Sequence, residues 1–482
     1  MKLKSCSYLG HGLLIVLTFS LTACQSMRGP EPIVETNLPA TFQHANGPSI
    51  AEIGYKDFFI DSRLIKVIQL ALENNRDLRT ATLNIERSQQ LFQISQSNQL
   101  PTIGASGSIL RQNTPNTSTS FNIGLGMTAY ELDLWGRVRS LKESALDRYF
   151  ATASARDATQ IALIGQVANT WLAYSYAHAN LQLAEKTLKS QQDAYSLNKK
   201  RFKVGIDSEL SVRQAQISVE TARTDIGYYK TQIAQNLNAL NLLIGQPISE
   251  ELLTYTKVKT VSSIDPFGTG LPSDLLLNRP DLRSAAFNLS ATGGNIGAAK
   301  AQLFPTIRLT GATGYASTDL NDLFKSGGFN WSIGPSLDLP IFDWGKRKLN
   351  IKIAEIDQKI ALSDYEKAIQ SAFKEVNDAL AIRNSINTRL SAQHRLVEAS
   401  RASYELSNKR FSSGIDDYFN VLDAQRNLYN AEKSLLVLEQ INLNNEIELY
   451  KALGGGIKIS TTDLIHIEQS SQKRNLRYFL YS

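Results

Sequence analysis

The stretch that begins at Trp135-Gly136-Arg137 and ends at Arg201-Phe202-Lys203-Val204-Gly205 contains no proline. Proline is the main helix breaker, so its absence over this length permits one continuous helix. At about 1.5 Å of rise per residue, such a helix would be roughly 100 Å long. No single globular domain encloses a helix of that length, so it must belong to a coiled coil or to a tube of helices.

The same stretch occurs a second time. Trp344-Gly345 and Arg410-Phe411-Ser412-Ser413-Gly414 have the same spacing, and each closing glycine is followed by Ile-Asp. Apolar residues recur at steps of three and four in both stretches, which predicts one stripe that packs on a partner helix. An ordinary coiled-coil stalk would show the same period and remains an alternative. The stripe consists of Ile161, Ile164, Ala168, Trp171, Tyr174, Leu181, Ala184 and Leu188 in the first stretch and of Ile353, Ile356, Ile360, Tyr365, Ala368, Ala372, Val376, Ala379 and Ile386 in the second.

A larger plan is duplicated around these two stretches. Asp281-Leu282-Arg283 repeats Asp77-Leu78-Arg79, and Phe304-Pro305-Thr306-Ile307 repeats Leu100-Pro101-Thr102-Ile103 at the same distance. Each copy reads as a helix, a β-hairpin, a long helix and a return helix, which is the signature of an internal duplication. The return helix and the helix before the hairpin together match the long helix in length, so the two short helices can pair with it end to end.

The two hairpins alternate in polarity. Apolar residues from Phe121 to Ala129 alternate with small or polar ones, and the same holds from Ile307 to Tyr315 and from Trp331 to Ile341. Four strands of about ten residues are long enough to cross an outer membrane when tilted, but four cannot close a barrel. We therefore expect several copies to share one barrel, and a homotrimer with twelve strands is the natural count. A pair of soluble hairpins in an exported protein is the alternative.

The N-terminus carries an export signal. Lys2 and Lys4 precede an apolar run that is too short to span a bilayer, which is typical of a signal peptide. Leu21-Thr22-Ala23-Cys24 resembles the bacterial lipobox, so we expect Cys24 to be acylated and to anchor the protein in the outer membrane of a Gram-negative bacterium, with the chain extending into the periplasm. Cys6 would leave with the signal, so stability must come from packing and not from disulfides.

These signals predict a mixed, mainly α fold with long coiled coils that form an α-helical barrel and with four strands per chain. Residues 1–23 are the signal peptide and 24–61 a lipidated tether. Residues 62–246 form the first repeat, with a hairpin at about 101–134 and a tip at 205. Residues 247–280 are an equatorial connector, and 281–456 form the second repeat, with a hairpin at about 304–342 and a tip at 414. Residues 457–482 are a C-terminal tail.

The composition and the motifs exclude several functional classes. The formal net charge of +6 is too small and dispersed to indicate nucleic acid. The five histidines have no metal-ligand spacing, and neither a phosphate-binding glycine loop nor a nucleophile elbow is present. Gly293-Gly294-Asn295-Ile296-Gly297 lacks the preceding strand that dinucleotide binding requires, so it predicts close helix packing. We expect no enzymatic activity, no metal and no cofactor other than the lipid on Cys24.

Several motifs resemble the TolC/OprM family of outer-membrane channels, in particular its lipoprotein branch in tripartite RND drug-efflux pumps. They are Tyr130-Glu131-Leu132-Asp133-Leu134-Trp135-Gly136-Arg137, Leu339-Pro340-Ile341-Phe342-Asp343-Trp344-Gly345, Asn278-Arg279-Pro280-Asp281-Leu282, Val421-Leu422-Asp423-Ala424-Gln425 and the two glycine tips. The resemblance covers roughly residues 55–456. It implies a trimer whose barrel continues as a helical tunnel, docks on a periplasmic adaptor (membrane fusion) protein and serves an inner-membrane RND transporter.

The tips and the segment after the second tip contain the candidate working residues. Glycine supplies a left-handed helix end at Gly205 and Gly414. By resemblance, Arg201 with Gly205 and Arg410 with Gly414 meet the adaptor. By resemblance again, Phe419, Asn420 and Asp423 line the periplasmic constriction, where three aspartates around one axis would favour cations. Asp423 could instead be a solvated residue on a helix face, and Asp416 could add to the acidic ring or cap the helix.

Two other functions remain open at this stage. A channel of the same fold could serve protein secretion or metal-ion efflux. A trimeric structural or adhesive stalk of the cell envelope would have the same helical period without conducting anything. The substrate cannot be deduced, because a passive duct has no selective pocket.

Overall fold

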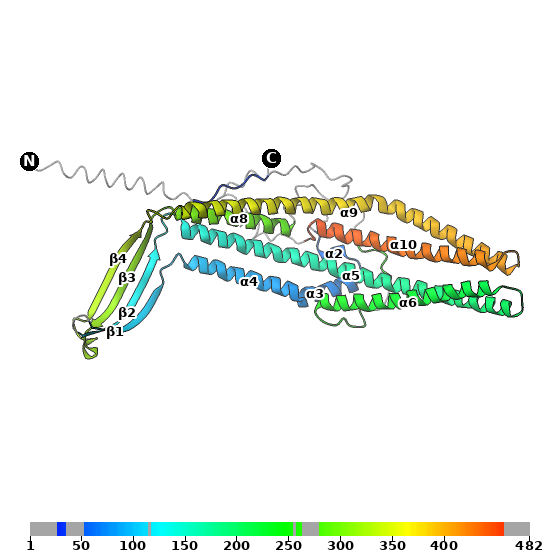
Figure 1. Ribbon diagram of the computed structural model, residues 1–482, viewed down its shortest axis with the longest axis horizontal. Helices are drawn as coiled ribbons and strands as arrows, with labels where there is room; N and C mark the ends of the chain where they lie inside the picture. The colour runs from blue at the N-terminus through cyan, green and yellow to red at the C-terminus, as the bar shows by residue number, and fades with distance from the viewer. Residues whose placement is uncertain (1–26, 35–52, 114–116, 254–256, 263–278, 457–482) are drawn as a thin grey trace, which may run out of the picture. The chain divides into compact units, whose positions relative to one another are not determined.

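The computed structural model describes residues 27–34, 53–113, 117–253, 257–262 and 279–456. The predicted signal peptide, Cys24 and the C-terminal tail lie outside these ranges. Figure 1 shows the elements in the duplicated order that the sequence predicts. The first copy consists of α2 (Tyr55–Phe58), α3 (Ser62–Asn74), α4 (Arg76–Ser97), β1 (Ile103–Asn113), β2 (Thr117–Glu131), α5 (Arg137–Lys203) and α6 (Glu209–Ile244). The second consists of α8 (Pro280–Ala301), β3 (Thr306–Ser317), the short η1 (Leu320–Asp322), β4 (Phe329–Asp338), α9 (Lys346–Ser412) and α10 (Tyr418–Ala452).

The chain divides into two compact units. The first unit comprises Met1–Thr36, Thr82–Ser154 and Leu282–Ala368, and so holds the strands, α8, most of α4 and the first parts of α5 and α9. The second comprises Asn37–Ala81, Ala155–Asp281 and Ile369–Ser482, and holds α2, α3, α6, α10 and the remainder of α5 and α9. The two long helices therefore pass through both units.

The strands form one antiparallel sheet in the order β1-β2-β3-β4. Ile103 pairs with Met127, Phe121 with Ser317 and Thr306 with Asp338, so both predicted hairpins are confirmed and pair with each other. A Cβ at Gly314 would lie 2.2 Å from the carbonyl oxygen of Ile123, so only glycine permits β2 and β3 to approach at this point. β1 and β4 are the two edges of the sheet.

Local side-chain contacts fix where α5 and α9 begin. The carboxylate of Asp133 accepts hydrogen bonds from the backbone N–H groups of Val138 (2.9 Å) and Arg139 (2.8 Å), which satisfies free donors at the start of α5. Asp343 does the same for Gly345 (3.1 Å) and Arg347 (3.2 Å) near the start of α9. The Asp-x-Trp-Gly or Asp-Trp-Gly boundary therefore sets the end of each hairpin and the start of each long helix.

In the first unit, α8 packs closely on α5. A Cβ at Gly294 would lie 2.6 Å from the carbonyl oxygen of Ser140, so the predicted role of the glycines in close helix packing is confirmed. Ser144 Oγ donates to Asn295 Oδ1 at 2.9 Å, and the rings of Phe150 and Phe287 lie 5.3 Å apart. Small and polar groups on the two helices thus meet directly.

The apolar stripe of the second long stretch is only partly buried. From Tyr365 to Ile386 its members are mostly buried, as predicted, but Ile353, Ile356 and Ile360 are each more than half exposed in the single chain. α4 has a comparable exposed set, Leu83, Leu91 and Ile94. Both sets lie in the first unit.

The predicted tether to residue 61 differs from the structure at its C-terminal end. Residues 55–58 form α2, and Phe58 and Phe59 are buried. The Phe58 ring stacks on Tyr450 of α10 with 4.3 Å between centroids, and Phe59 forms an isolated antiparallel bridge with Ser262 of the predicted connector. Proline, glycine and polar residues dominate the segment as a whole, which masked the local apolar cluster in the sequence.

Within the described ranges, no helix is both long enough and apolar enough to cross a membrane. The same ranges contain no group of three or more His, Cys, Asp or Glu side chains that could hold a metal ion.

Candidate functional site

Both predicted tips end their helices in the same way. Gly205 has φ +75° and Gly414 has φ +74°, in the left-handed region. The N–H of Gly205 donates to the carbonyl of Phe202 and the N–H of Ile206 to that of Arg201, which is the Schellman pattern. The second tip repeats both bonds. A Cβ at either glycine would meet nothing within 4 Å of the described chain, so the backbone conformation and not close packing requires glycine here.

Each tip arginine has an aspartate partner within its own turn. Arg410 makes two bonds to Asp416, at 2.6 and 2.9 Å, and this pairing holds the pKa of Asp416 below its usual range. Arg201 lies 3.5 Å from Asp207, and its guanidinium lies 4.8 Å from the centre of the Phe411 ring. Asp207 was not among the predicted site residues, although the repeated Gly-Ile-Asp was the signal that could have found it.

Three of the four predicted constriction residues share one side of α10, and the fourth, Asp416, lies in the tip turn before this helix. Phe419 is 56% exposed, and Asn420 and Asp423 are also exposed. Asn427, one turn further on, donates its side-chain N–H to Asp423 Oδ2 at 3.1 Å. Arg426 is exposed close to Asp423 as well and was not predicted. The spacing of three and four residues therefore brings the predicted apolar and acidic residues together on a free helix face.

The opposite side of α10 is held in the core of the second unit. Tyr418, Val421 and Leu422 are buried in a cluster with Ala215 of α6 and Phe411 of α9. Burial raises the pKa of Tyr418 to about 12. This cluster fixes the rotation of α10 about its own axis and so determines which residues face outward.

A polar contact joins α10 to α6 further from the tip. The Tyr429 hydroxyl donates to Asp225 Oδ2 at 2.6 Å, and Lys433 Nζ lies 3.7 Å from the same oxygen. Burial, followed by the bond to Asp225, raises the pKa of Tyr429. These residues were not predicted, because their pairing depends on the relative placement of two helices that are far apart in the sequence.

The arrangement offers two kinds of surface. The tips present turns with internally paired charges, and α10 presents an apolar residue beside a carboxylate. Cys24 lies outside the described residues, and its acylation stays a prediction. The assignment of Arg201, Gly205, Arg410 and Gly414 to an adaptor contact, and of Phe419, Asn420, Asp423 and Asp416 to a gate, also stays a prediction.

Comparisons with known proteins agree with this geometry. Residues 67–246 and 271–455 match the family model described as "Outer membrane efflux protein". The chain is 42% identical over 414 residues to the solvent efflux pump outer membrane protein SrpC of Pseudomonas putida, covering 84% of this chain and 88% of the relative. It is 36% identical over 416 residues to the cation efflux system protein CusC of Escherichia coli, covering 84% and 89%.

A solved structure has the same fold over almost its whole length. The open state of the MtrE outer membrane channel of Neisseria gonorrhoeae superposes with a TM-score of 0.85 at 37% identity, covering 90% of this chain and 99% of that one. The family model alone spans well over half of the sequence. The chain therefore belongs to the family of outer membrane efflux proteins.

Proposed function

We propose that three copies of this chain form the outer-membrane exit duct of a tripartite efflux pump, which conducts substrates passively to the exterior. The observation that carries the proposal is that the long helix of the first copy is covered by the short helix of the second, whereas the long helix of the second copy is not covered by the short helix of the first. α8 covers α5 within the chain. Their counterparts, α4 and α9, leave their apolar rows exposed in the same unit.

The duplication predicts how the exposed rows meet. Aligning the glycines Gly136 and Gly345 places Ile353 of α9 where α5 has Ser144, and aligning the helices before the hairpins places Leu91 of α4 where α8 has Asn295. Ser144 and Asn295 are hydrogen-bonded within the chain. By the same geometry, Ile353 would contact Leu91 of a neighbouring copy. Repeating this contact around an axis gives a closed ring.

The sheet supports the same closure. Its edge strands, β1 and β4, each have one partner in the sheet, and most side chains of the four strands are at least partly exposed. An open sheet edge is not tolerated in lipid, so β1 of one copy must pair with β4 of the next. Three copies give twelve strands, which lies within the range of known outer-membrane barrels.

A cysteine crosslink tests the ring. In the variant with Leu91→Cys and Ile353→Cys, mild oxidation should link copies into a ladder that ends at the trimer, since the two residues would meet between chains. Ser144→Cys with Asn295→Cys is the matched control, which should crosslink within one chain and stay monomeric in denaturing gels. A ladder from the control pair and none from the test pair would contradict the proposed contact.

Conduction is tested separately. The purified trimer in a planar bilayer should give discrete conductance steps, because a duct encloses water, whereas an adhesive or structural stalk would give none. We expect the tips at Gly205 and Gly414 to dock on a periplasmic adaptor, which couples the duct to an inner-membrane RND transporter. Relatives are named for solvent and cation efflux, so the transporter and not this chain would select the substrate.

Lipidation of Cys24 is part of the proposal. It rests on Leu21-Thr22-Ala23-Cys24 at the end of the apolar signal core. Intact mass spectrometry of the mature protein should show acyl mass on an N-terminal Cys24, and Cys24→Ala should abolish it while trimers still form, because the barrel is itself inserted in the membrane. An unmodified N-terminus at another residue would refute the lipid anchor and leave the duct untouched.

A further inference from the structure

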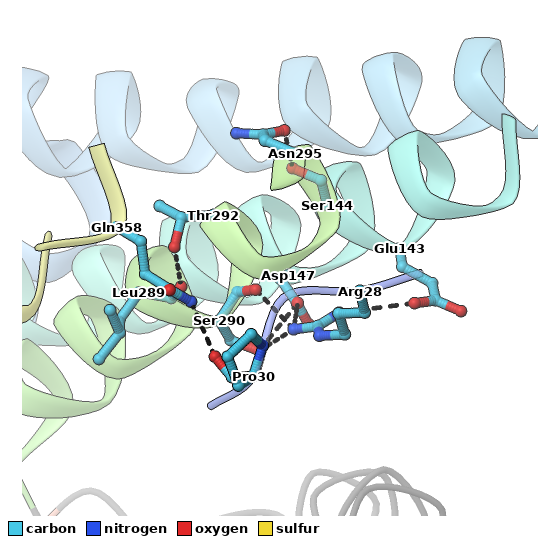
Figure 2. Close-up of polar contacts among 10 residues, drawn as sticks. All are labelled: Arg28, Pro30, Glu143, Ser144, Asp147, Leu289, Ser290, Thr292, Asn295 and Gln358. Atoms are coloured by element: carbon cyan, nitrogen blue, oxygen red, sulfur yellow. Dashed lines mark hydrogen bonds and ion pairs between the residues drawn. The ribbon is translucent and has the colours of Figure 1, made fainter. Parts of the chain in front are cut away.

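The segment just after Cys24 is bound tightly to the first unit. Figure 2 shows the Arg28 side chain between α5 and α8, with Pro30 beside α9 residue Gln358. Arg28 Nη2 lies 3.0 Å from Asp147 Oδ2 and 2.7 Å from Ser290 Oγ, and it donates to the Ser290 carbonyl at 2.5 Å. Nη1 lies 3.5 Å from Glu143. Gln358 donates to the carbonyl of Pro30 at 3.1 Å.

The backbone of Arg28 and Gly29 also packs closely against α8. The N–H of Gly29 donates to the carbonyl of Gly293 at 3.1 Å. A Cβ at Gly297 would lie 3.0 Å from the backbone nitrogen of Arg28, and a Cβ at Gly29 would lie 2.8 Å from the side chain of Ile296. Both surfaces therefore lack a Cβ where they touch. Part of the glycine-rich run in α8 makes room for this segment.

The binding place is built only between α5 and α8, and the equivalent helices α9 and α4 lack it. Where α8 has Gly293, Gly294 and Gly297, the corresponding positions of α4 have Gln89, Gln90 and Gln93. Where α5 has Glu143 and Asp147, the corresponding positions of α9 have Lys352 and Ile356. The fold itself does not require this site, because α4 and α9, the equivalents of α8 and α5, lack every part of it.

The ion pair is deeply buried. The Asp147 side chain is 1% exposed and that of Arg28 is 13% exposed. A buried carboxylate is costly without a cationic partner, so removing Arg28 would leave Asp147 without compensation for its charge. Ser290 Oγ also donates to Asp147 Oδ2 at 2.9 Å, which orients the carboxylate toward Arg28.

We propose that Arg28 is a positioning residue for the lipid on Cys24, because its contacts with Asp147 and Ser290 hold the acylated residue near the start of α5. This inference rests on the proposed lipidation. An extended chain covers at most about 3.6 Å per residue, so the chain from Arg28 back to Cys24 can span at most roughly 14 Å. Asp147 lies about 15 Å along the axis from Arg137, where α5 begins next to the strands. The residues between Arg28 and Cys24 are therefore long enough to bring the lipid close to the start of α5, beside the strands.

Spin labelling tests this inference on the full trimer in phospholipid vesicles. A nitroxide on Ser26→Cys lies between the lipid and Arg28, and acylation leaves Cys24 unreactive. We expect an immobilised spectrum at one defined depth. Arg28→Ala should replace it with a mobile component, and so should Gly297→Ala, which crowds the segment without changing any charge. Arg148→Ala is the matched control on α5, because it removes an exposed cation next to Asp147, and it should leave the spectrum unchanged.

A lengthened chain distinguishes two roles of Arg28, positioning of the lipid and stabilisation of the packing between α5 and α8. Eight Gly and Ser residues inserted between Ser26 and Met27 preserve every contact of Arg28 but free the lipid. If Arg28 positions the lipid, this variant and Arg28→Ala should slow the appearance of newly made trimer in the outer membrane to the same extent, as Cys24→Ala should, while the final amount of trimer is unchanged, and combining them should add nothing. A normal rate of trimer appearance for the lengthened chain, or a label that is equally mobile with and without Arg28, would overturn the inference. A missing acyl mass on Cys24 would instead refute the proposed lipid anchor, whatever the label does.

Discussion

The two long helices, α5 of the first copy and α9 of the second, use equivalent faces for different purposes. On α5, the long helix of the first copy, Ser140, Ser144 and Asp147 are covered by α8 with small and polar contacts. In the second, the corresponding row of α9 is apolar and exposed. Partners on one chain need no association energy, whereas separate chains must offset the loss of translational and rotational freedom. Buried aliphatic side chains supply that energy at about 0.8 kcal/mol per CH₂ group. The row consists of Leu349, Ile353, Ile356 and Ile360.

The two tips, in contrast to the two long helices, are closely similar. Their glycines, their backbone bonds and the presence of an Arg-Asp pair are the same. The charge contact differs: Asp416 is bound by Arg410 at two points, whereas Arg201 is shared between Asp207 and the Phe411 ring. Divergence is therefore concentrated where chains would meet each other, and similarity is kept where both hairpins would meet a common partner.

The largest expected effect comes from giving α9, at the proposed interface, the residue that α5 has at the equivalent position. Ile356→Asp introduces the residue that α5 has at this position, but without Arg28 to pair with it. A buried, unpaired carboxylate costs about 3–5 kcal/mol in each copy, so the trimer should dissociate or fail to form. Native mass spectrometry measures the oligomer. Glu355→Gln changes a charge one residue away and should leave the trimer intact, and a stable Ile356→Asp trimer would contradict the proposed α9–α4 contact.

The next effect concerns the shared feature of the tips. Gly205→Trp and Gly414→Trp should both impair efflux while leaving the trimer inserted, because bulk at a docking turn blocks close approach. Each also forces a side chain into the left-handed region, at about 1–2 kcal/mol. Gly205→Ala and Gly414→Ala carry the same strain without the bulk and should efflux nearly normally. If alanine and tryptophan lower drug resistance equally, the glycines serve only to reverse the chain.

A smaller effect, on ion selectivity, should distinguish α10 from α6, the two return helices. Aligned on the tip glycines, Asp423 of α10 corresponds to Gln214 of α6. If α10 lines the constriction, Asp423→Asn should lower cation preference and weaken block by multivalent cations, since three like charges near low-dielectric walls create a strong field. Reversal potentials in a salt gradient measure this. Gln214→Asp should change them less. Equal selectivity in Asp423→Asn and the unmodified channel would place Asp423 away from the pore.

The smallest effect is a pH dependence at the second tip. The pKa of Asp416 is lowered by Arg410, so the folded carboxyl is more acidic than the unfolded one. Its stabilising contribution is present above about pH 4, the unfolded pKa, and is lost as the pH falls through the lower folded value. Asp416→Asn should remove this dependence. Thermal melts between pH 6 and 3 compare the two proteins, and parallel curves would show that the pair contributes nothing. Because the pair is exposed, we expect a small difference.

Much of the fold could be predicted because its signals are local. The absence of proline and the two closing glycines place α5 and α9 within a few residues of their bounds, and strict alternation identifies the hairpins. The face shared by Phe419 and Asp423 follows from helical spacing alone. The bonds Arg410–Asp416 and Tyr429–Asp225 could not be predicted in the same way, since the first depends on the turn conformation and the second on the rotation of two helices.

The sequence by itself determined the lengths of the elements, their duplication and the family to which the chain belongs, because proline, glycine and polarity patterns act on neighbouring residues. Only the tertiary structure decided which equivalent faces are covered and which are open. α5 and α9 have the same length and the same period, yet one is covered by α8 and the other is left exposed. Only the fold, likewise, brings Arg28 to Asp147, because a buried ion pair between residues so far apart in the chain depends on three-dimensional packing that no local pattern encodes.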